Sequence, residues 1–270
     1  MDKEALAFIQ NTAIAATCEL DLSKPAIVLP ENLHLHSLEK YNKQKLRFKG
    51  RFKTHSPAEF TKYIEYYQNQ GKSELICFIH PNEMMAQVIF DLGDHFIPGH
   101  AEHQALLNLD PTSAYLALKE IEGSKTQTTV IQWLEDWRDN LKLYGENETD
   151  IPIKPAIAAL RRINIKTQKE SEHTEEVFRS ARSTLEQIEA NNHENMPTHF
   201  IMKIVPYFGL DMMEISFRMT LLLEEKNPGF LIQMVKAEQV REVMMDQFKS
   251  KLMGYLSPLG IKVYVGTFII

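Results

Sequence analysis

The chain has 270 residues, and its 44% apolar and 24% charged content is typical of a globular protein that needs no disulfides or metals to fold. A net charge of −6 excludes a strongly basic nucleic-acid binder but is compatible with a local basic face. No apolar run reaches the length of a membrane span, and residues 3–16 predict an amphipathic helix rather than a secretion signal. Cys18 and Cys77 form no metal-binding pattern, so we expect a cytoplasmic protein with reduced, buried thiols.

A cationic strand is the clearest pattern in the first part of the chain, after short extended segments expected at 26–29 and 34–38. Residues 46–53 alternate between apolar and cationic side chains, which predicts a half-buried strand. A row of cations about 7 Å apart could follow the phosphates of an extended nucleic-acid strand. The alternative is a solvated face that discourages edge-to-edge pairing, because this stretch places no stacking aromatic ring on the cationic face. The cations of the row are Arg47, Lys49, Arg51 and Lys53.

Three histidines follow a strand expected at 84–92. They are His95, in a loop, and His100 and His103, in a helix expected from Gly99 to Leu109. Residues three apart share a helix face, so His100 and His103 with a loop ligand could hold a divalent metal. The stretch lacks the local carboxylate base of an HExxH motif and has no cysteine support. The alternative is that these histidines cap the helix, hydrogen-bond the loop or face solvent.

The remaining patterns predict an α+β fold made of two mixed helix and sheet units, mainly with antiparallel strands, linked by a helical segment. We expect an N-terminal α+β domain at 1–150, a helical connector at 151–195 and a C-terminal α+β unit at 196–270, although one continuous domain is an open alternative. Arg161 and Arg162 end the helix expected at 153–163, where cations meet the helix dipole favourably. The other elements are helices expected at 57–70, 111–122, 124–144, 177–190 and 237–256, and strands at 74–79, 199–205, 213–223, 230–235 and 261–270.

Several short motifs occur in a consistent order along nearly the whole chain. They include Leu29-Pro30-Glu31, Arg47-Phe48-Lys49-Gly50, Pro98-Gly99-His100-Ala101-Glu102-His103, Leu109-Asp110-Pro111-Thr112, Trp133-Leu134-Glu135-Asp136-Trp137 and Pro206-Tyr207-Phe208-Gly209-Leu210. In these motifs the chain resembles the YfdQ-like family of proteins encoded by bacteriophages and prophages. The resemblance implies a phage early-region product in the cytoplasm of a bacterial host. It carries no activity, cofactor or catalytic residue with it.

Three functions remain in competition. We expect first a non-enzymatic, homo-oligomeric accessory protein without a cofactor, which binds single-stranded DNA or a host-defence protein and no membrane. Its binding residues would be the four cations of the strand, with Arg161 and Arg162 as helpers. The second is a self-assembling ring- or shell-forming structural protein, and the third a metal-dependent enzyme that uses the three histidines.

Overall fold

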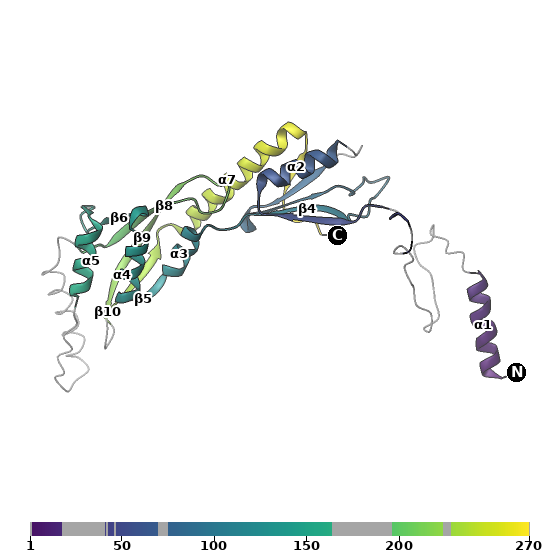
Figure 1. The fold of residues 1–270 in the computed structure, drawn as a ribbon, viewed down its shortest axis with the longest axis horizontal. Coiled ribbons are helices and arrows are strands. Elements are labelled where there is room, and N and C mark those ends of the chain that lie inside the picture. The colour runs from purple at the N-terminus through teal and green to yellow at the C-terminus, as the bar shows by residue number, and fades with distance from the viewer. Residues whose placement is uncertain are drawn as a thin grey trace. The chain divides into compact units, whose positions relative to one another are not determined.

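The computed structural model describes residues 2–17, 41, 43–45, 47–69, 75–163, 196–223 and 228–269 (Figure 1). Two compact units are present, Met1–Arg47 and Phe48–Ile270. The first contains helix α1 (Lys3–Thr17), on which Leu6, Phe8 and Ile9 are exposed. The extended segments expected at 26–29 and 34–38, the helix expected at 177–190 and most of the connector lie outside the described residues.

Two sheets form the second unit in the described part of the chain. The five-stranded sheet has the order β1 (Gly50–Thr54), β4 (His103–Asn108), β3 (Met85–Ile89), β2 (Ile76–His80) and β11 (Lys262–Val265). Its three central strands pair antiparallel, and the two outer strands pair parallel to their neighbours. Because β11 is the last strand of the chain, the sheet is completed by a segment far from the others in sequence.

Helices α2 (Pro57–Gln68) and α7 (Ala237–Leu256) lie over one side of this sheet (Figure 1). The ring of Tyr63 on α2 stacks on Phe52 of β1, with 4.3 Å between the ring centroids. Phe60 and Ile64 of α2 are completely buried. Side chains in a strand alternate between its two sides, so the neighbours of Phe52 in β1 face away from α2.

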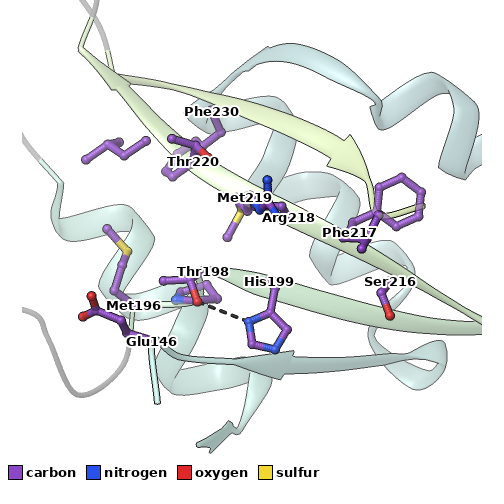
Figure 2. Close-up of a pocket in the computed structure, with 13 residues that line it drawn as sticks. Glu146, Met196, Thr198, His199, Ser216, Phe217, Arg218, Met219, Thr220 and Phe230 are labelled. Atoms are coloured by element: carbon purple, nitrogen blue, oxygen red, sulfur yellow. Dashed lines mark hydrogen bonds between the residues drawn. The ribbon is translucent and has the colours of Figure 1, made fainter. Parts of the chain in front are cut away.

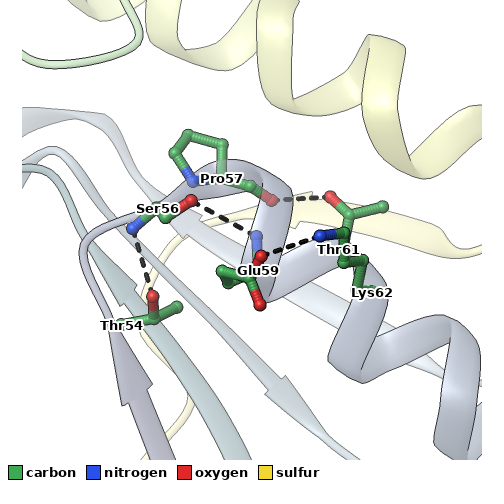
Figure 3. Close-up of polar contacts among 6 residues, drawn as sticks. All are labelled: Thr54, Ser56, Pro57, Glu59, Thr61 and Lys62. Atoms are coloured by element: carbon green, nitrogen blue, oxygen red, sulfur yellow. Dashed lines mark hydrogen bonds and ion pairs between the residues drawn. The ribbon is translucent and has the colours of Figure 1, made fainter.

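The start of α2 is fixed by local hydrogen bonds (Figure 3). The Ser56 hydroxyl accepts from the Glu59 backbone N–H at 3.3 Å, and Pro57 occupies the first turn. In a complete capping box the Glu59 carboxylate would accept from the Ser56 N–H. Here the Ser56 N–H donates instead to the Thr54 hydroxyl at 3.1 Å. The Glu59 carboxylate instead pairs with Lys62 at 2.9 Å.

The six-stranded sheet has the order β5 (Gly123–Thr126), β10 (Pro228–Met234), β9 (Met213–Leu223), β8 (His199–Ile204), β6 (Leu141–Tyr144) and β7 (Asp150–Ile151). All of these neighbours pair antiparallel. Phe200 and Phe217 stack at 5.0 Å on the buried side, and Trp133 of α4 (Gln127–Asp136) lies 5.4 Å from Phe200. Helices α3 (Ser113–Ile121) and α5 (Ile153–Arg162) flank α4 and help to bury this side.

The structure confirms the α+β class, the helix at 237–256 and the hairpin of β9 and β10. The helix expected from Gly99 to Leu109 is wrong, because this stretch is a loop followed by β4. Ala101, Ala105 and Leu109 are spaced by four residues, which satisfies a period of two as well as a helical period. The helix expected at 124–144 is also interrupted, since β5 precedes α4 and β6 follows it.

The sheets cross the domain boundaries expected from the sequence. Strands β5 and β6, before residue 152, pair with β10 and β8, respectively, which come after residue 195. Conversely, β11 joins a sheet whose other strands all precede residue 109. Long-range pairing of this kind has no local signal in the sequence.

Candidate nucleic-acid interface

The cations of the expected strand do not form one continuous row. The strand begins only at Gly50, so Arg47 and Lys49 precede it, and Arg47 belongs to the first unit. Lys49 is half-buried, and its Nζ lies 3.9 Å from a carboxylate oxygen of Glu102. Arg51 and Lys53 are exposed on β1 and form no ion pair within the described ranges. The strand therefore presents two cations rather than four.

Arg51 and Lys53 project from the side of the sheet opposite α2. Phe52 lies between them in the strand and packs against Tyr63 of that helix. Next to Arg51 in the register, Gln104 of β4 and Ile89 of β3 are buried. The row that contains Lys53 is more accessible, and it is the part of the sheet where a ligand could lie.

The register carries this second row across all five strands. Lys53 pairs with Leu106, Leu106 with Gln87, Gln87 with Phe78, and Phe78 with Tyr264. The three central side chains are half-buried, while Lys53 and Tyr264 are exposed at the two ends. We call these five residues the cross-sheet row. Four strand spacings make it about 19 Å long.

Aromatic rings occupy the β11 end of the cross-sheet row. The rings of Phe78 and Tyr264 are nearly parallel, at 26° with 6.2 Å between centroids, and Tyr264 is 54% exposed. Phe268 stacks on Phe78 at 4.9 Å. The sequence interpretation found no aromatic ring on the cationic face, because it considered β1 alone. The rings come from β2, β11 and the segment after β11, which only the sheet register brings together.

Arg161 and Arg162 lie at the end of α5, which packs beside the six-stranded sheet rather than the five-stranded one. Arg161 is paired with Glu135 of α4, with 2.5 Å between Nη2 and the carboxylate oxygen. The two arginines flank a shallow hollow that also includes Lys154. They thus form a separate basic surface and do not extend the row that starts at Lys53.

The three histidines do not converge. His95 and His100 are exposed in the loop between β3 and β4, whereas His103 is 6% exposed. The described residues contain no group of three or more histidine, cysteine, aspartate or glutamate side chains placed to hold a metal ion. The helix that would have put His100 and His103 on one face does not form.

His103 lies in an aromatic box on the helix-covered side of the five-stranded sheet. The centroids of Phe48 and Phe90 are each 4.3 Å from the imidazole centroid, and that of Tyr67 is 4.6 Å away. The Tyr63 hydroxyl hydrogen-bonds the imidazole Nε2 at 3.0 Å. Burial lowers the pKa of His103, an effect that the nearby Asp91 carboxylate opposes. The pKa of Tyr63 is raised to about 12, mainly by burial and further by Tyr67. This histidine is therefore a neutral, satisfied core residue.

Asp91 organises the loop that precedes β4. Its two carboxylate oxygens accept from the backbone N–H groups of Glu102 at 3.0 Å and His103 at 2.9 Å. The carboxylate is thus engaged by the backbone of the same hairpin, and it fixes the point at which β4 begins. Together with the buried imidazole, this makes the region a structural element of the sheet.

Residues 2–268 match the family described as "Uncharacterized conserved protein (DUF2303)". The chain belongs to this family. No curated protein and no solved structure matches the chain. None of the described helices of this DUF2303 protein has the length and apolarity needed to cross a bilayer. The match covers nearly the whole chain and brings no activity with it, so the geometry of the sheets is the basis for a proposed function.

Proposed function

We propose that the exposed side of the five-stranded sheet binds single-stranded nucleic acid. The observation that carries the proposal is the cross-sheet row, which begins at Lys53, is flanked by Arg51, and ends at Phe78 and Tyr264. Cations and exposed rings on one sheet surface are the combination that single strands need, since phosphates pair with the cations and unpaired bases stack on the rings.

The dimensions and the charge of the surface support a short, weakly bound single strand. A row of about 19 Å has room for only a few nucleotides of an extended strand. The bases of a duplex are already stacked and paired, so they cannot stack on these rings. The overall charge of −6 repels the phosphates at long range, so the affinity depends on the local cations and rings.

The test is fluorescence anisotropy with a labelled oligothymidylate at low salt, in which we compare the double variant Arg51→Gln/Lys53→Gln with the native chain. A matched control is Arg138→Gln/Lys142→Gln, which removes the same charge from an exposed position on β6 and one in the turn before it. We expect the first variant alone to lose affinity. Absence of binding by the native chain, or an equal loss in the control, would refute the proposal.

We further propose that the protein is a phage- or prophage-encoded accessory protein that acts in the host cytoplasm. The YfdQ-like motifs along the chain support this origin, and a single-strand binder fits phage DNA metabolism. A host-defence protein is the alternative partner, and it would be indicated if nucleic-acid binding failed while such a protein was captured. Sequencing of the flanking genes tests the origin, because housekeeping genes on both sides would contradict it.

Self-assembly is a second candidate function, favoured by apolar side chains that the described structure leaves exposed. Phe8 of α1 is 73% exposed, and Phe96 and Ile97 of the loop between β3 and β4 are 89% and 76% exposed. Surfaces of this kind are typical of contacts between subunits. Light scattering at micromolar concentration decides the matter, and a monomeric mass would remove this candidate.

A further inference from the structure

A separate cavity lies at the six-stranded sheet, with a volume of about 570 Å³ (Figure 2). This volume is within the range of small-molecule sites. In Figure 2, Glu146 and Met196 lie at one end of the lining, Ser216 lies at the other, and His199 and Arg218 lie between them. The lining combines apolar side chains with hydroxyl, imidazole and guanidinium groups, so it can contact both parts of an amphiphilic ligand.

The imidazole of His199 is held from two sides. Its Nδ1 lies 3.3 Å from the Thr198 hydroxyl, and its ring stacks on Tyr144 at 5.0 Å with 9° between the planes. Because the same hydroxyl donates its proton to the Tyr144 carbonyl at 3.4 Å, the imidazole N–H is on Nδ1 and donates to the hydroxyl. The ring is therefore fixed in place, with Nε2 as a hydrogen-bond acceptor for a ligand.

Arg218 stands directly across the ladder from His199. The two residues are register partners of β9 and β8, so their side chains leave the same side of the sheet. Arg218 is exposed, and the described parts of the chain supply no acidic partner for it. Ser216 and Thr220 flank Arg218 on the same side of β9, each about 7 Å away. A guanidinium with hydroxyls on both sides is a donor set for a doubly charged oxyanion.

We propose that this cavity binds a small phosphate monoester that carries a planar apolar group. The phosphate oxygens accept from Arg218 and from the hydroxyls that flank it, and the apolar group lies toward Met196. This binding is independent of the five-stranded sheet, because no residue of the cross-sheet row lines the cavity.

The test is isothermal titration calorimetry with phenyl phosphate, and inorganic phosphate serves as the apolar-free reference. We expect phenyl phosphate to bind more tightly than phosphate, and Arg218→Gln to weaken it about tenfold or more, the loss of a charge-assisted hydrogen bond. Thr220→Val, a second exposed position, should weaken it less. Arg138→Gln is the matched control, since it removes an exposed arginine outside the cavity.

Two ligand sources share this chemistry, a free phosphate ester and the 5′-phosphate end of an oligonucleotide. A second arm therefore compares a trithymidylate with and without a 5′-phosphate, in the Arg51→Gln/Lys53→Gln background. Binding of phenyl phosphate that depends on Arg218 supports the proposal with a free ester, and a gain limited to the phosphorylated trithymidylate supports it with a nucleic-acid end. Absence of binding by both probes, or binding unchanged by Arg218→Gln, would overturn it.

Discussion

Removal of the two exposed cations of β1 should change the salt dependence of single-strand binding by a calculable amount. Each phosphate neutralised by a cation contributes a slope of about −0.7 to log K against log[salt] for a single strand. Arg51 and Lys53 are exposed, and they form no ion pair within the described ranges, so each can neutralise one phosphate. The double variant Arg51→Gln/Lys53→Gln should therefore reduce the slope by about 1.4.

The expected effect is measurable by a titration of anisotropy at several salt concentrations. Between 50 and 200 mM salt, a slope of about 1.4 corresponds to a loss of roughly sevenfold in affinity. The native chain should lose about that much more than the double variant over this range. Lys49→Gln should change the slope less, because Glu102 lies 3.9 Å from the Lys49 ammonium. Equal slopes for the native chain and the double variant would refute the assignment of these two cations to phosphate binding.

Four further outcomes are expected. Tyr264→Ala should weaken oligothymidylate binding by about 1–3 kcal/mol in the anisotropy assay, because a base loses its stacking partner. The melting temperature of this variant should not change, since the ring is 54% exposed. Phe200→Ala should lower the free energy of unfolding in urea by about 3–5 kcal/mol, as the side chain is fully buried, and a loss below about 1 kcal/mol would contradict the packing. Ser56→Ala should cost about 1 kcal/mol in the same assay through the lost cap; no change would mean that Pro57 suffices. Burial lowers the pKa of His103, so as the pH falls the unfolded chain binds a proton at this histidine before the folded chain does. The free energy of unfolding should therefore fall below pH 6.5, by at most about 1.4 kcal/mol per pH unit. Urea midpoints measured at two pH values should depend less on pH in His103→Phe than in the native chain.

The sequence predicted those elements whose signals are local. The start of α2 follows from Ser56 and Pro57. The pairing of β9 with β10 follows from the apolar runs on either side of the signal at Asn227-Pro228-Gly229, although Pro228 and Gly229 themselves belong to β10. Helix α7 has the predicted bounds, since Met244, Phe248 and Leu252 form a buried stripe at helical spacing. In each case a few neighbouring residues decide the conformation.

The candidate interface could be predicted only in part, because half of it depends on pairing between distant strands. Alternation in β1 correctly put Arg51 and Lys53 on the side opposite Phe52. The aromatic half required the parallel pairing of β11 with β2, which brings Tyr264 beside Phe78. No pattern within either strand specifies that partner, since a strand can pair with many others of similar composition.

The helix expected from Gly99 to Leu109 was wrong for a different reason. Spacings of four residues fit a helix and a strand equally, and the tertiary environment decided between them. His103 became a strand residue because its imidazole fits between the rings of Phe48 and Phe90 and bonds to Tyr63. His103, which the sequence suggested as a metal ligand, is thus a buried core residue.

The late return of β11 has a consequence for synthesis on the ribosome. Strands β1 to β4 emerge first, and one edge of β2 then has no partner strand while the whole six-stranded sheet is translated. At typical elongation rates this delay is on the order of ten to forty seconds. During that interval an unpaired apolar edge is exposed to other nascent chains, and such edges recruit foreign strands. The proposed binding surface is thus complete only after β11 has been translated, and until then the open edge of β2 is a site where aggregation can start.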